Sequence, residues 1–390
     1  MMLPLAIGLV SAIIIIHGLL ILGWQVNFRR FESPPLSEHP RVAVLLAVRN
    51  EAHYLPACLD HLLRMDYPSD RLRIWVGNDM SDDDTLAIAR RYARQDDRIR
   101  VVDITGTLGE ARAKSNAIAH LTQANARSDR PADLLLITDA DVRVSPGWAR
   151  GMLRRWRAAP LSPPVGIVTG VTVVAGRSAW EVWQRIDWLF ALGMVKVASD
   201  LGIPVATLGN NMLLHRSAYE ATGGYETMPF SITEDFQILH QTVAHGYHFR
   251  NIIDPDTRVM TQPMASLPQL LQQRKRWTYG ALQLPFYLVI ILLVQALFYP
   301  LLAYIATQEA GLAASLWFVK TGSQLLFIGM VIKKIRLPSP LSRQTWRHLA
   351  TFELYSSLLS LVSLVYFLIP TRVVWKGRRF RGKRATVGEE

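Results

Sequence analysis

The sequence predicts an α/β domain flanked by membrane helices at both ends of the chain. Residues 3–24 contain no acidic or basic side chain, and three further apolar runs close the chain at 281–306, 311–332 and 349–370. Between residues 26 and 280, short β-branched runs alternate with amphipathic stretches, as strands alternate with helices in α/β domains. Half of the residues are hydrophobic and only 19% are charged, which suits a protein partly embedded in a membrane.

The first predicted element is a transmembrane helix over residues 1–25. Its uncharged run is long enough to cross a hydrocarbon core of about 30 Å. A signal peptide is the alternative, but no basic residue precedes the run and no small-residue cleavage pattern follows it. Arg29 and Arg30 come next, which places that end in the cytoplasm. We therefore expect an inner (plasma) membrane protein whose domain over 26–280 faces the cytoplasm.

Polar residues follow the first two predicted strands of this domain. The first strand leads into a polar turn at residues 49–51, and the second ends at Gly77 with Asp79 just beyond it. Either Ser81 or Asp82 is placed to cap the next helix. Ligands of open α/β sheets bind beyond the carboxyl ends of strands, so Asp79 is expected to face a ligand.

A third strand, predicted from the apolar run 134–137, leads directly into Asp139 and Asp141. Burying two unpaired carboxylates would cost several kcal/mol, so a positive group must meet them. Carboxylates in this pattern can bind Mg²⁺ or Mn²⁺, with substrate phosphate supplying further ligands. A turn or a helix cap is the simpler alternative for residues 139–141.

Two further motifs occur later in the domain. Glu234 and Asp235 begin a predicted helix, and helix-dipole stabilisation is the simplest account of them. The stretch 267–281 carries three consecutive basic residues at 274–276 and then Trp277, immediately before a membrane run. On its own this pattern indicates a juxtamembrane basic patch with an interfacial tryptophan.

The stretch 178–204 has a helical stripe of large apolar residues. Such a stripe fits either a buried core or a membrane interface. The aromatic residues Trp180, Trp183 and Trp188 favour the interface. We therefore expect interfacial segments near 178–204 and 266–280.

Most of the net charge of +12 lies in two blocks, 333–347 and 371–390. Both blocks flank membrane runs, so membrane orientation and anionic lipid explain them better than nucleic acid does. The single cysteine, Cys58, excludes an intrachain disulfide and a cysteine metal cluster. We expect no nucleic-acid partner.

The C-terminal part, residues 281–370, predicts about three helices, followed by the basic tail 371–390. Three crossings after a cytoplasmic domain would place this tail outside, against the positive-inside tendency. We therefore expect one segment to be re-entrant or interfacial, and the run that carries Lys320 is the first choice. Because no paired charges are expected in these runs, nothing favours a transporter.

In combination, these motifs resemble the membrane-bound family 2 glycosyltransferases with a GT-A fold, the group that includes ceramide glucosyltransferase and the cellulose and hyaluronan synthases. The matching pieces occur in the family's order between residues 42 and 280. They are Asn50-Glu51, Asp79, Lys114, Asp139-Ala140-Asp141, Gly209 to Met212, Gly223-Gly224, Thr233-Glu234-Asp235 and the Q-x-x-R-W of Gln273 to Trp277. The resemblance implies a Rossmann-like mixed sheet and a hexosyltransferase.

The resemblance also implies roles for single residues. Asp141, together with Asp139, would bind Mg²⁺ or Mn²⁺, and Asp235 would be the catalytic base with Glu234 beside it. The implied donor-side residues are Asn50, Glu51, Asp79, Lys114, Asp139, Gln273, Arg276 and Trp277, with Asp79 at the base or ribose. The implied acceptor-side residues are Trp277 and Asn211.

Two departures from the family pattern concern the donor. Ala47 stands where a proline is usual near the first turn, and Ala113 stands where a glycine usually precedes the lysine. Both lie in nucleotide-side loops, so the identity of the nucleotide-diphospho-sugar stays open, with a UDP-sugar favoured.

The implied reaction is an inverting, metal-dependent transfer of a sugar to a membrane lipid. The ending V-x-W-K-G-R at residues 373–378 resembles that of many lipid-modifying members, and three helices after the domain are few for a polymer channel. The alternative is a processive polysaccharide synthase with a growing glycan as acceptor. An inactive glycan-binding protein fits less well, because every implied catalytic position is filled.

Overall fold

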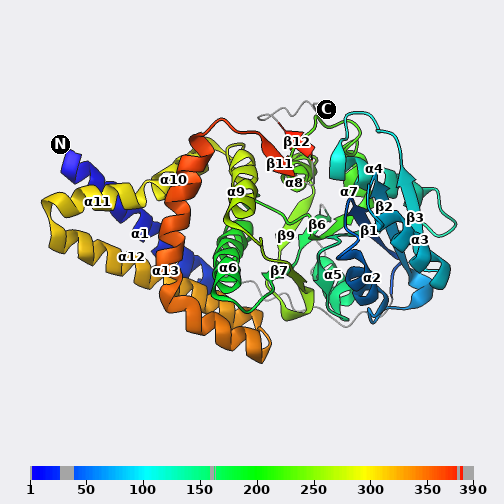
Figure 1. Ribbon diagram of the computed structural model, residues 1–390, viewed down its shortest axis with the longest axis horizontal. Helices are drawn as coiled ribbons and strands as arrows, with labels where there is room; N and C mark the ends of the chain where they lie inside the picture. The colour runs from blue at the N-terminus through cyan, green and yellow to red at the C-terminus, as the bar shows by residue number, and fades with distance from the viewer. Residues whose placement is uncertain (1, 27–38, 159–161, 163, 376–377, 381–390) are drawn as a thin grey trace. The chain divides into compact units, whose positions relative to one another are not determined.

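The computed structural model describes residues 2–26, 39–158, 162, 164–375 and 378–380, which fall into two compact units (Figure 1). We call the unit that contains residues 1–29, 174–201 and 263–373 the helical unit. The sheet unit contains residues 30–173, 202–262 and 374–390. The end of the chain thus belongs to the sheet unit, although the whole C-terminal helical region precedes it.

A seven-stranded sheet forms the centre of the sheet unit, in the order β3-β2-β1-β4-β8-β6-β9. Strands β1 to β4 run parallel, while β8 is antiparallel to both of its neighbours. The sheet is therefore mixed, as the sequence predicted. The bounds are β1 (Val42–Val48), β2 (Leu72–Asp79), β3 (Ile99–Ile104), β4 (Leu134–Asp139), β6 (Val165–Thr169), β8 (Asn211–His215) and β9 (His248–Asn251).

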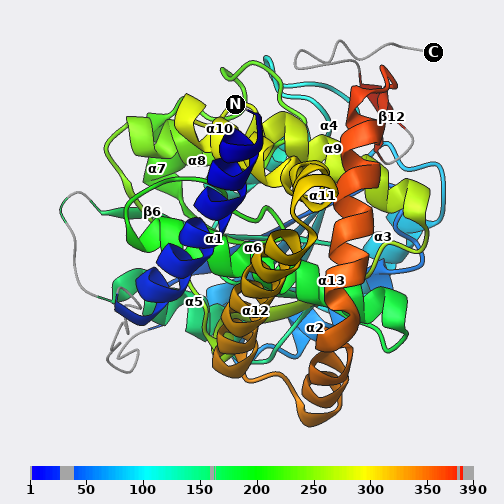
Figure 2. The ribbon, with the colours of Figure 1, turned by 90° about the vertical axis from the view of Figure 1, so that its left-hand side faces the viewer.

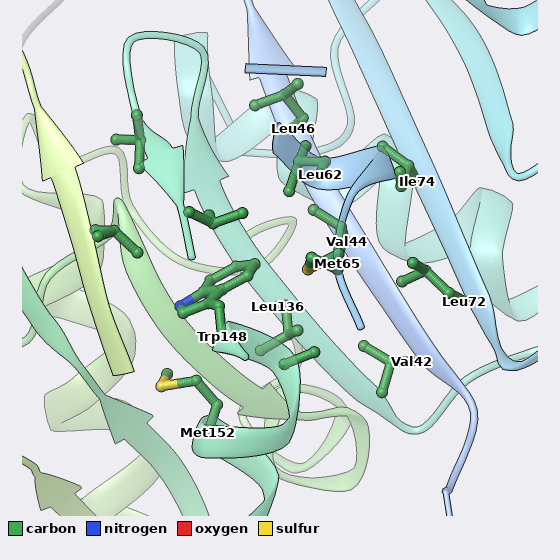
Figure 3. Close-up of a cluster of buried hydrophobic side chains, with 14 of the residues drawn as sticks. Val42, Val44, Leu46, Leu62, Met65, Leu72, Ile74, Leu136, Trp148 and Met152 are labelled. Atoms are coloured by element: carbon green, nitrogen blue, oxygen red, sulfur yellow. The ribbon is translucent and has the colours of Figure 1, made fainter. Parts of the chain in front are cut away.

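Helices cover both faces of this sheet. Alternate strand residues point to opposite faces, so Val42, Val44 and Leu46 of β1 enter one core (Figure 3) while Ala43 and Leu45 enter the other. The first core is covered by α2 (Leu55–Leu63), α3 (Thr85–Gln95) and α5 (Trp148–Arg157). The second is covered by α4 (Ala113–Ala126), α7 (Arg216–Ala221) and α8 (Glu234–Ala244).

Smaller elements complete the sheet unit. A three-stranded sheet has the order β5-β10-β7, and β11 pairs with β12 near the end of the chain. The bounds are β5 (Arg143–Val144), β7 (Val171–Val174), β10 (Arg258–Thr261), β11 (Val373–Trp375) and β12 (Arg378–Phe380), with short 3₁₀ turns at η1 (Ser69–Arg71) and η2 (Pro255–Thr257).

The start of α3 differs from the prediction. Strand β2 continues to Asp79, and the helix begins only at Thr85 with Asp84 as its N-cap. The backbone N–H of Thr85 is bonded instead by Asp83 Oδ1, at 3.0 Å. Ser81 and Asp82 therefore do not cap α3, because they belong to the loop before it.

The helical unit contains α1 (Met2–Val26), α6 (Ala179–Asp200), α9 (Leu267–Ala281), α10 (Phe286–Ala296), α11 (Phe298–Gln308), α12 (Ala310–Ile335) and α13 (Ser339–Leu368). Among the described residues, α1, α12 and α13 are long and apolar enough to cross a membrane. Helices α10 and α11 meet at a bend of 49° and form either one broken span or a re-entrant loop. In this unit, α1 packs against α11 and α12, and α13 packs along α6 and α9 (Figure 2).

The structure contradicts the expected absence of paired charges in the membrane runs, and it places no break in the run that carries Lys320. The run that carries Lys320 is one continuous helix, and the break lies in the preceding run between α10 and α11. The membrane runs also contain a charge pair, since Lys320 Nζ lies 2.7 Å from Glu353 Oε1 on α13. Both side chains are buried, and Tyr299 on α11 also donates to Glu353 at 2.5 Å. A buried charge inside a helix bundle needs such a partner, and the sequence pattern did not show which residue it would be.

Candidate active site

The loops after β1 and β2 are joined by hydrogen bonds at the carboxyl edge of the sheet. The Arg49 guanidinium donates to the carbonyls of Asp79, at 2.8 Å, and Met80, at 2.7 Å. The register explains this contact, because Val48 lies opposite Asn78, so Arg49 follows β1 next to the point where β2 ends at Asp79.

Asn50 and Glu51 strengthen the same junction. The Asn50 backbone donates to Ser81 Oγ at 3.1 Å, and its side-chain oxygen accepts from the Asp82 backbone at 2.9 Å. The Glu51 side chain is buried, and its backbone N–H donates to Thr85 Oγ1 at 2.7 Å. Asn50 and Glu51, which were predicted to bind the sugar donor, therefore stabilise the conformation of these loops. Their contact with a nucleotide stays a prediction.

Three non-glycine residues near this edge have a left-handed backbone. They are Asn50 with φ +54°, Met80 with φ +51° and Ala113 with φ +51°. Only one other non-glycine residue in the described ranges, Arg336, shares this conformation. Backbone strain of this kind collects at functional sites, where the surrounding structure holds it in place. It also explains why a glycine would suit position 113 better than the alanine found here.

Lys114 lies at the centre of a cluster of charged residues. Its Nζ is 2.5 Å from Asp139 Oδ1, 3.0 Å from the Gly209 carbonyl and 3.6 Å from Glu234 Oε1. Burial by itself would lower the pKa of Lys114, but the carboxylates of Asp139, Glu234 and Asp235 raise it above its usual value. The lysine therefore stays protonated and is one positive partner for the carboxylates of the D-x-D motif, Asp139 and Asp141.

Asp141 lies in a different environment. Thr261 Oγ1 on β10 donates to its Oδ2 at 3.3 Å. Burial and the nearby negative charge of Asp139 raise the pKa of Asp141 to about 6. A partly buried carboxylate next to a second negative charge is suited to a cation. Mg²⁺ or Mn²⁺ needs only one or two carboxylates when phosphate supplies other ligands. Among the described residues, no cluster of three or more His, Cys, Asp or Glu could hold a metal. Asp139 and Asp141 therefore fit a metal whose other ligands come from the substrate.

Asp235, the predicted base, lies at the first turn of α8. Its Oδ2 accepts from the Gly209 backbone N–H at 3.0 Å, and its Oδ1 accepts from the Phe236 backbone at 2.8 Å. A Cβ at position 209 would lie 3.2 Å from Asp235 Cβ and 3.3 Å from Lys114 Nζ, so the glycine allows this close approach. Gly209 thus links the lysine, through its carbonyl, to the predicted base, through its N–H.

Asn211, an implied acceptor-side residue, makes its side-chain hydrogen bonds within the protein, and its acceptor-side role stays a prediction. Its side chain is fully buried, its Oδ1 accepts from Trp148 Nε1 at 2.8 Å, and its Nδ2 donates to the Thr257 carbonyl at 3.0 Å. An amide bonded at both ends inside the protein stabilises the packing of α5 and η2 on the sheet, so it has a structural role.

Gln273, Arg276 and Trp277 lie on α9 of the helical unit, whereas the residues above lie in the sheet unit. The Trp277 ring packs against Trp188 of α6 with ring centroids 4.8 Å apart. Their donor-side and acceptor-side roles stay predictions.

The structure adds two residues that the motif analysis did not assign to the site. Thr261 contacts Asp141 from a strand far along the chain, and no sequence signal marks it. Arg378 Nη1 and Nη2 donate to Asp79 Oδ2 and Oδ1, at 2.7 and 3.1 Å. Arg378 did have a signal, because it is the arginine of the V-x-W-K-G-R ending.

Comparison with known proteins identifies the family. A model described as Glycosyl transferase family 21 matches residues 7–386. The chain belongs to this family. The resemblance to the group that includes ceramide glucosyltransferase is confirmed, and the family is refined from family 2 to family 21.

Curated relatives of this family 21 chain are distant. A β-monoglucosyldiacylglycerol synthase of Synechocystis is 25% identical over 266 residues, which are 65% of this chain and 51% of the relative. A probable glycosyltransferase of Bacillus subtilis, YdaM, is 25% identical over 286 residues, 71% of this chain and 65% of the relative. The chain thus spans between about half and two thirds of the length of these relatives.

Among solved structures, the mannosyltransferase PcManGT from Pyrobaculum calidifontis, in complex with GDP-Man and Mn²⁺, is similar to the family 21 chain with a TM-score of 0.54 and 18% identity. The match covers 93% of this chain and 99% of the other. At this identity the likeness concerns the fold. Together with the mixed sheet it confirms the predicted GT-A fold.

Proposed function

We propose that this family 21 protein transfers a sugar from a nucleotide-diphospho-sugar to a hydroxyl of a membrane lipid, with inversion at the anomeric carbon. The observation that carries the proposal is the linked set of Asp139, Lys114, Gly209 and Asp235. It places two carboxylates and one cation at the carboxyl edge of a GT-A sheet, where substrates of such sheets bind.

On the donor side, Asp139 and Asp141 are the proposed residues for Mg²⁺ or Mn²⁺. A bound divalent cation would stabilise the negative charge of the leaving diphosphate. Lys114 holds Asp139 in place at 2.5 Å and adds positive charge next to it. We propose a UDP-sugar as the donor, with Asp79 on the nucleotide side.

Asp235 is the proposed base. The acceptor oxygen forms a bond to the anomeric carbon, the bond from that carbon to the diphosphate oxygen breaks, and the proton of the hydroxyl passes to the Asp235 carboxylate. Its two backbone hydrogen bonds fix the carboxylate without using all its lone pairs. Since one displacement inverts the centre, a single proton acceptor is sufficient, unlike the carboxylate pair of a retaining hydrolase.

The proposed acceptor is a lipid. Two observations support it: the Synechocystis relative is named for monoglucosyldiacylglycerol synthesis, and the chain contains helices able to cross a membrane. Diacylglycerol, with its single free hydroxyl, is therefore the first acceptor to test, with glucose as the first sugar.

We also propose that the sheet unit faces the cytoplasm from the inner membrane. Strand β12 belongs to the sheet unit, and its Arg378 bonds to Asp79, so this end of the chain must lie on the same side as the domain. An even number of crossings must then separate them. Helix α6 begins and ends next to sheet-unit residues, so we infer that it does not cross. Both α12 and α13 pack against α6, and α13 does so more extensively. We infer that α10–α11 and α12 cross outward and back, and that α13 does not cross.

The test is to incubate the purified protein with a panel of nucleotide sugars and total membrane lipid, then identify the products by mass. One lipid carrying one or a few added sugars supports the proposal. A product that lengthens without dissociating would assign the protein to processive polysaccharide synthesis. Absence of product with every donor, alongside a folded protein, would point to an inactive glycan-binding protein.

A further inference from the structure

Asp79 is paired with the end of the chain. It lies at the carboxyl end of β2, is only 5% exposed, and both of its side-chain oxygens accept hydrogen bonds from Arg378 of β12. The two bonds are 2.7 and 3.1 Å long and come from different nitrogens of the guanidinium, so the pair is bidentate. A contact between residues 79 and 378 is the longest-range ion pair of the sheet unit among the described residues.

A second contact fixes the same short strand on the other side of Arg379. Phe380 is buried, and its ring stacks on Phe230 with centroids 5.6 Å apart and planes inclined by 23°. Phe230 precedes α8, the helix that begins with Glu234 and Asp235. Strand β12 therefore connects the loop edge of the donor side to the segment that leads to the proposed base.

The Arg378 guanidinium has N–H groups that do not bond to Asp79. A guanidinium has five N–H groups, and the two bonds to Asp79 use one from each terminal nitrogen. Within the described part of the chain, no other hydrogen bond of this guanidinium is present. An arginine held by a carboxylate keeps its full charge and a fixed plane, which is the form in which arginine binds phosphate oxygens.

We propose that Arg378 is a donor-binding residue, anchored by Asp79, whose guanidinium binds the nucleoside diphosphate. This inference rests on the proposed function and adds the C-terminal strand to its donor site. It assigns Asp79 a positioning role: an anionic carboxylate at that edge would repel a nucleoside diphosphate, whereas the Asp79–Arg378 pair presents a neutral carboxylate–guanidinium unit with N–H donors. The sequence had assigned Asp79 directly to the base or ribose.

Two other roles of the pair predict different results. If the pair only tied the tail to the domain, its loss would lower the melting temperature and leave donor affinity unchanged. If Arg378 instead kept Asp79 from contacting the donor, removal of Arg378 would increase the affinity of the protein for the donor. Binding measurements therefore separate these roles from the proposed one.

The experiment measures binding of UDP and GDP to the full-length protein by titration calorimetry in the presence of Mn²⁺. The variants are Arg378→Ala, Arg378→Lys and, as a matched control with the same loss of charge in the same tail, Arg372→Ala, whose side chain is exposed. We expect Arg378→Ala to bind the preferred nucleotide about 10- to 100-fold more weakly. Arg378→Lys should recover part of this loss, because lysine keeps the positive charge but lacks the paired N–H groups of a guanidinium. Arg372→Ala should bind the nucleotide as the wild type does.

A kinetic comparison completes the test. Arg378→Ala should raise the donor KM far more than it lowers kcat. Because Asp79 acts through the arginine, the double variant Asp79→Asn, Arg378→Ala should lose little more donor affinity than Arg378→Ala alone. Unchanged nucleotide affinity in Arg378→Ala, or tighter binding, would overturn the inference while leaving the proposed function in place. A folded wild-type protein that binds neither nucleotide and transfers no sugar would remove both.

Discussion

Lys114 Nζ lies 2.5 Å from Asp139 Oδ1, so the first carboxylate of the D-x-D pair has a cationic partner within the protein. Asp141 accepts a hydrogen bond from neutral Thr261 and has a raised pKa. The two carboxylates, one residue apart in sequence, are therefore not equivalent. One is held by the protein, and the other is best suited to a metal.

The first prediction concerns metal binding at Asp141. Mn²⁺ with UDP should raise the melting temperature of the wild type, and Asp141→Asn should lose this shift together with transfer, because the cation loses a charged ligand. Chelation should abolish transfer by the wild type, and added Mn²⁺ or Mg²⁺ should restore it. Full activity after exhaustive chelation would contradict the metal site.

The second prediction is a pH dependence of the metal-free protein. The pKa of Asp141 is raised to about 6 in the folded state, so the folded protein holds this proton more tightly than the unfolded chain does. Stability should therefore increase as the pH falls from about 7 toward 4, the range between the folded and the ordinary pKa. Asp141→Asn should lose this part of the pH dependence in thermal melts, and a wild type and variant with parallel profiles would show that the carboxylate is not repelled.

The third prediction separates the base from the metal ligand. Asp235→Asn keeps the size of the side chain but removes the proton acceptor, so transfer should fall by roughly 10²-fold or more while nucleotide-sugar binding stays near normal. If Asp235 only stabilised the start of α8, the variant would lose on the order of 1 kcal/mol of stability and keep its turnover. Turnover, donor affinity and melting temperature, measured on the same preparation, decide between these outcomes.

The fourth prediction concerns the backbone of Ala113. At φ +51°, an alanine costs about 1–2 kcal/mol and a glycine costs little, although glycine loses roughly 0.5–1 kcal/mol more entropy on folding. Ala113→Gly should therefore leave stability unchanged or raise it by up to about 1.5 kcal/mol. Ala124→Gly, inside the same helix, should lower it by about 1 kcal/mol. A large loss in Ala113→Gly, seen by thermal or denaturant unfolding, would contradict the strained conformation.

The fifth prediction tests the inferred topology with single cysteines. Arg343→Cys, in the first turns of α13, should be protected from a membrane-impermeant reagent in intact cells, and Gln308→Cys, at the end of α11, should react. Native Cys58 should stay silent, because it is buried and burial raises the pKa of its thiol. If Arg343→Cys reacts from outside, then α13 crosses the membrane and the tail cannot reach the sheet unit.

The sequence was a good guide wherever the information is local. The apolar run 134–137, the helix start at Glu234 and the helical stripe over 178–204 were predicted and occur as β4, α8 and α6. The family motifs also indicated that Lys114, Asp139 and Asp235 belong to one site, and the structure brings them together through Gly209.

Contacts between distant segments could not be predicted in this way. Nothing in the pattern around Thr261 or Arg378 indicates which carboxylate each contacts, because those pairings depend on how the sheet unit packs. The same holds for Asn211, whose amide bonds to Trp148 and Thr257, contacts that its motif position does not indicate. Donor identity, likewise, depends on side chains whose partners the motifs do not specify.

The pairing of Lys320 with Glu353 has a consequence for how the protein is made. Translation delivers α12 to the membrane before α13, so Lys320 enters without its carboxylate, and an unpaired lysine at the centre of a span costs about 2.5–3.5 kcal/mol on insertion scales. The two helices are joined by a connection of only three residues, 336–338. We therefore expect α12 to be stable in the membrane only once α13 has been made and Glu353 can pair with Lys320.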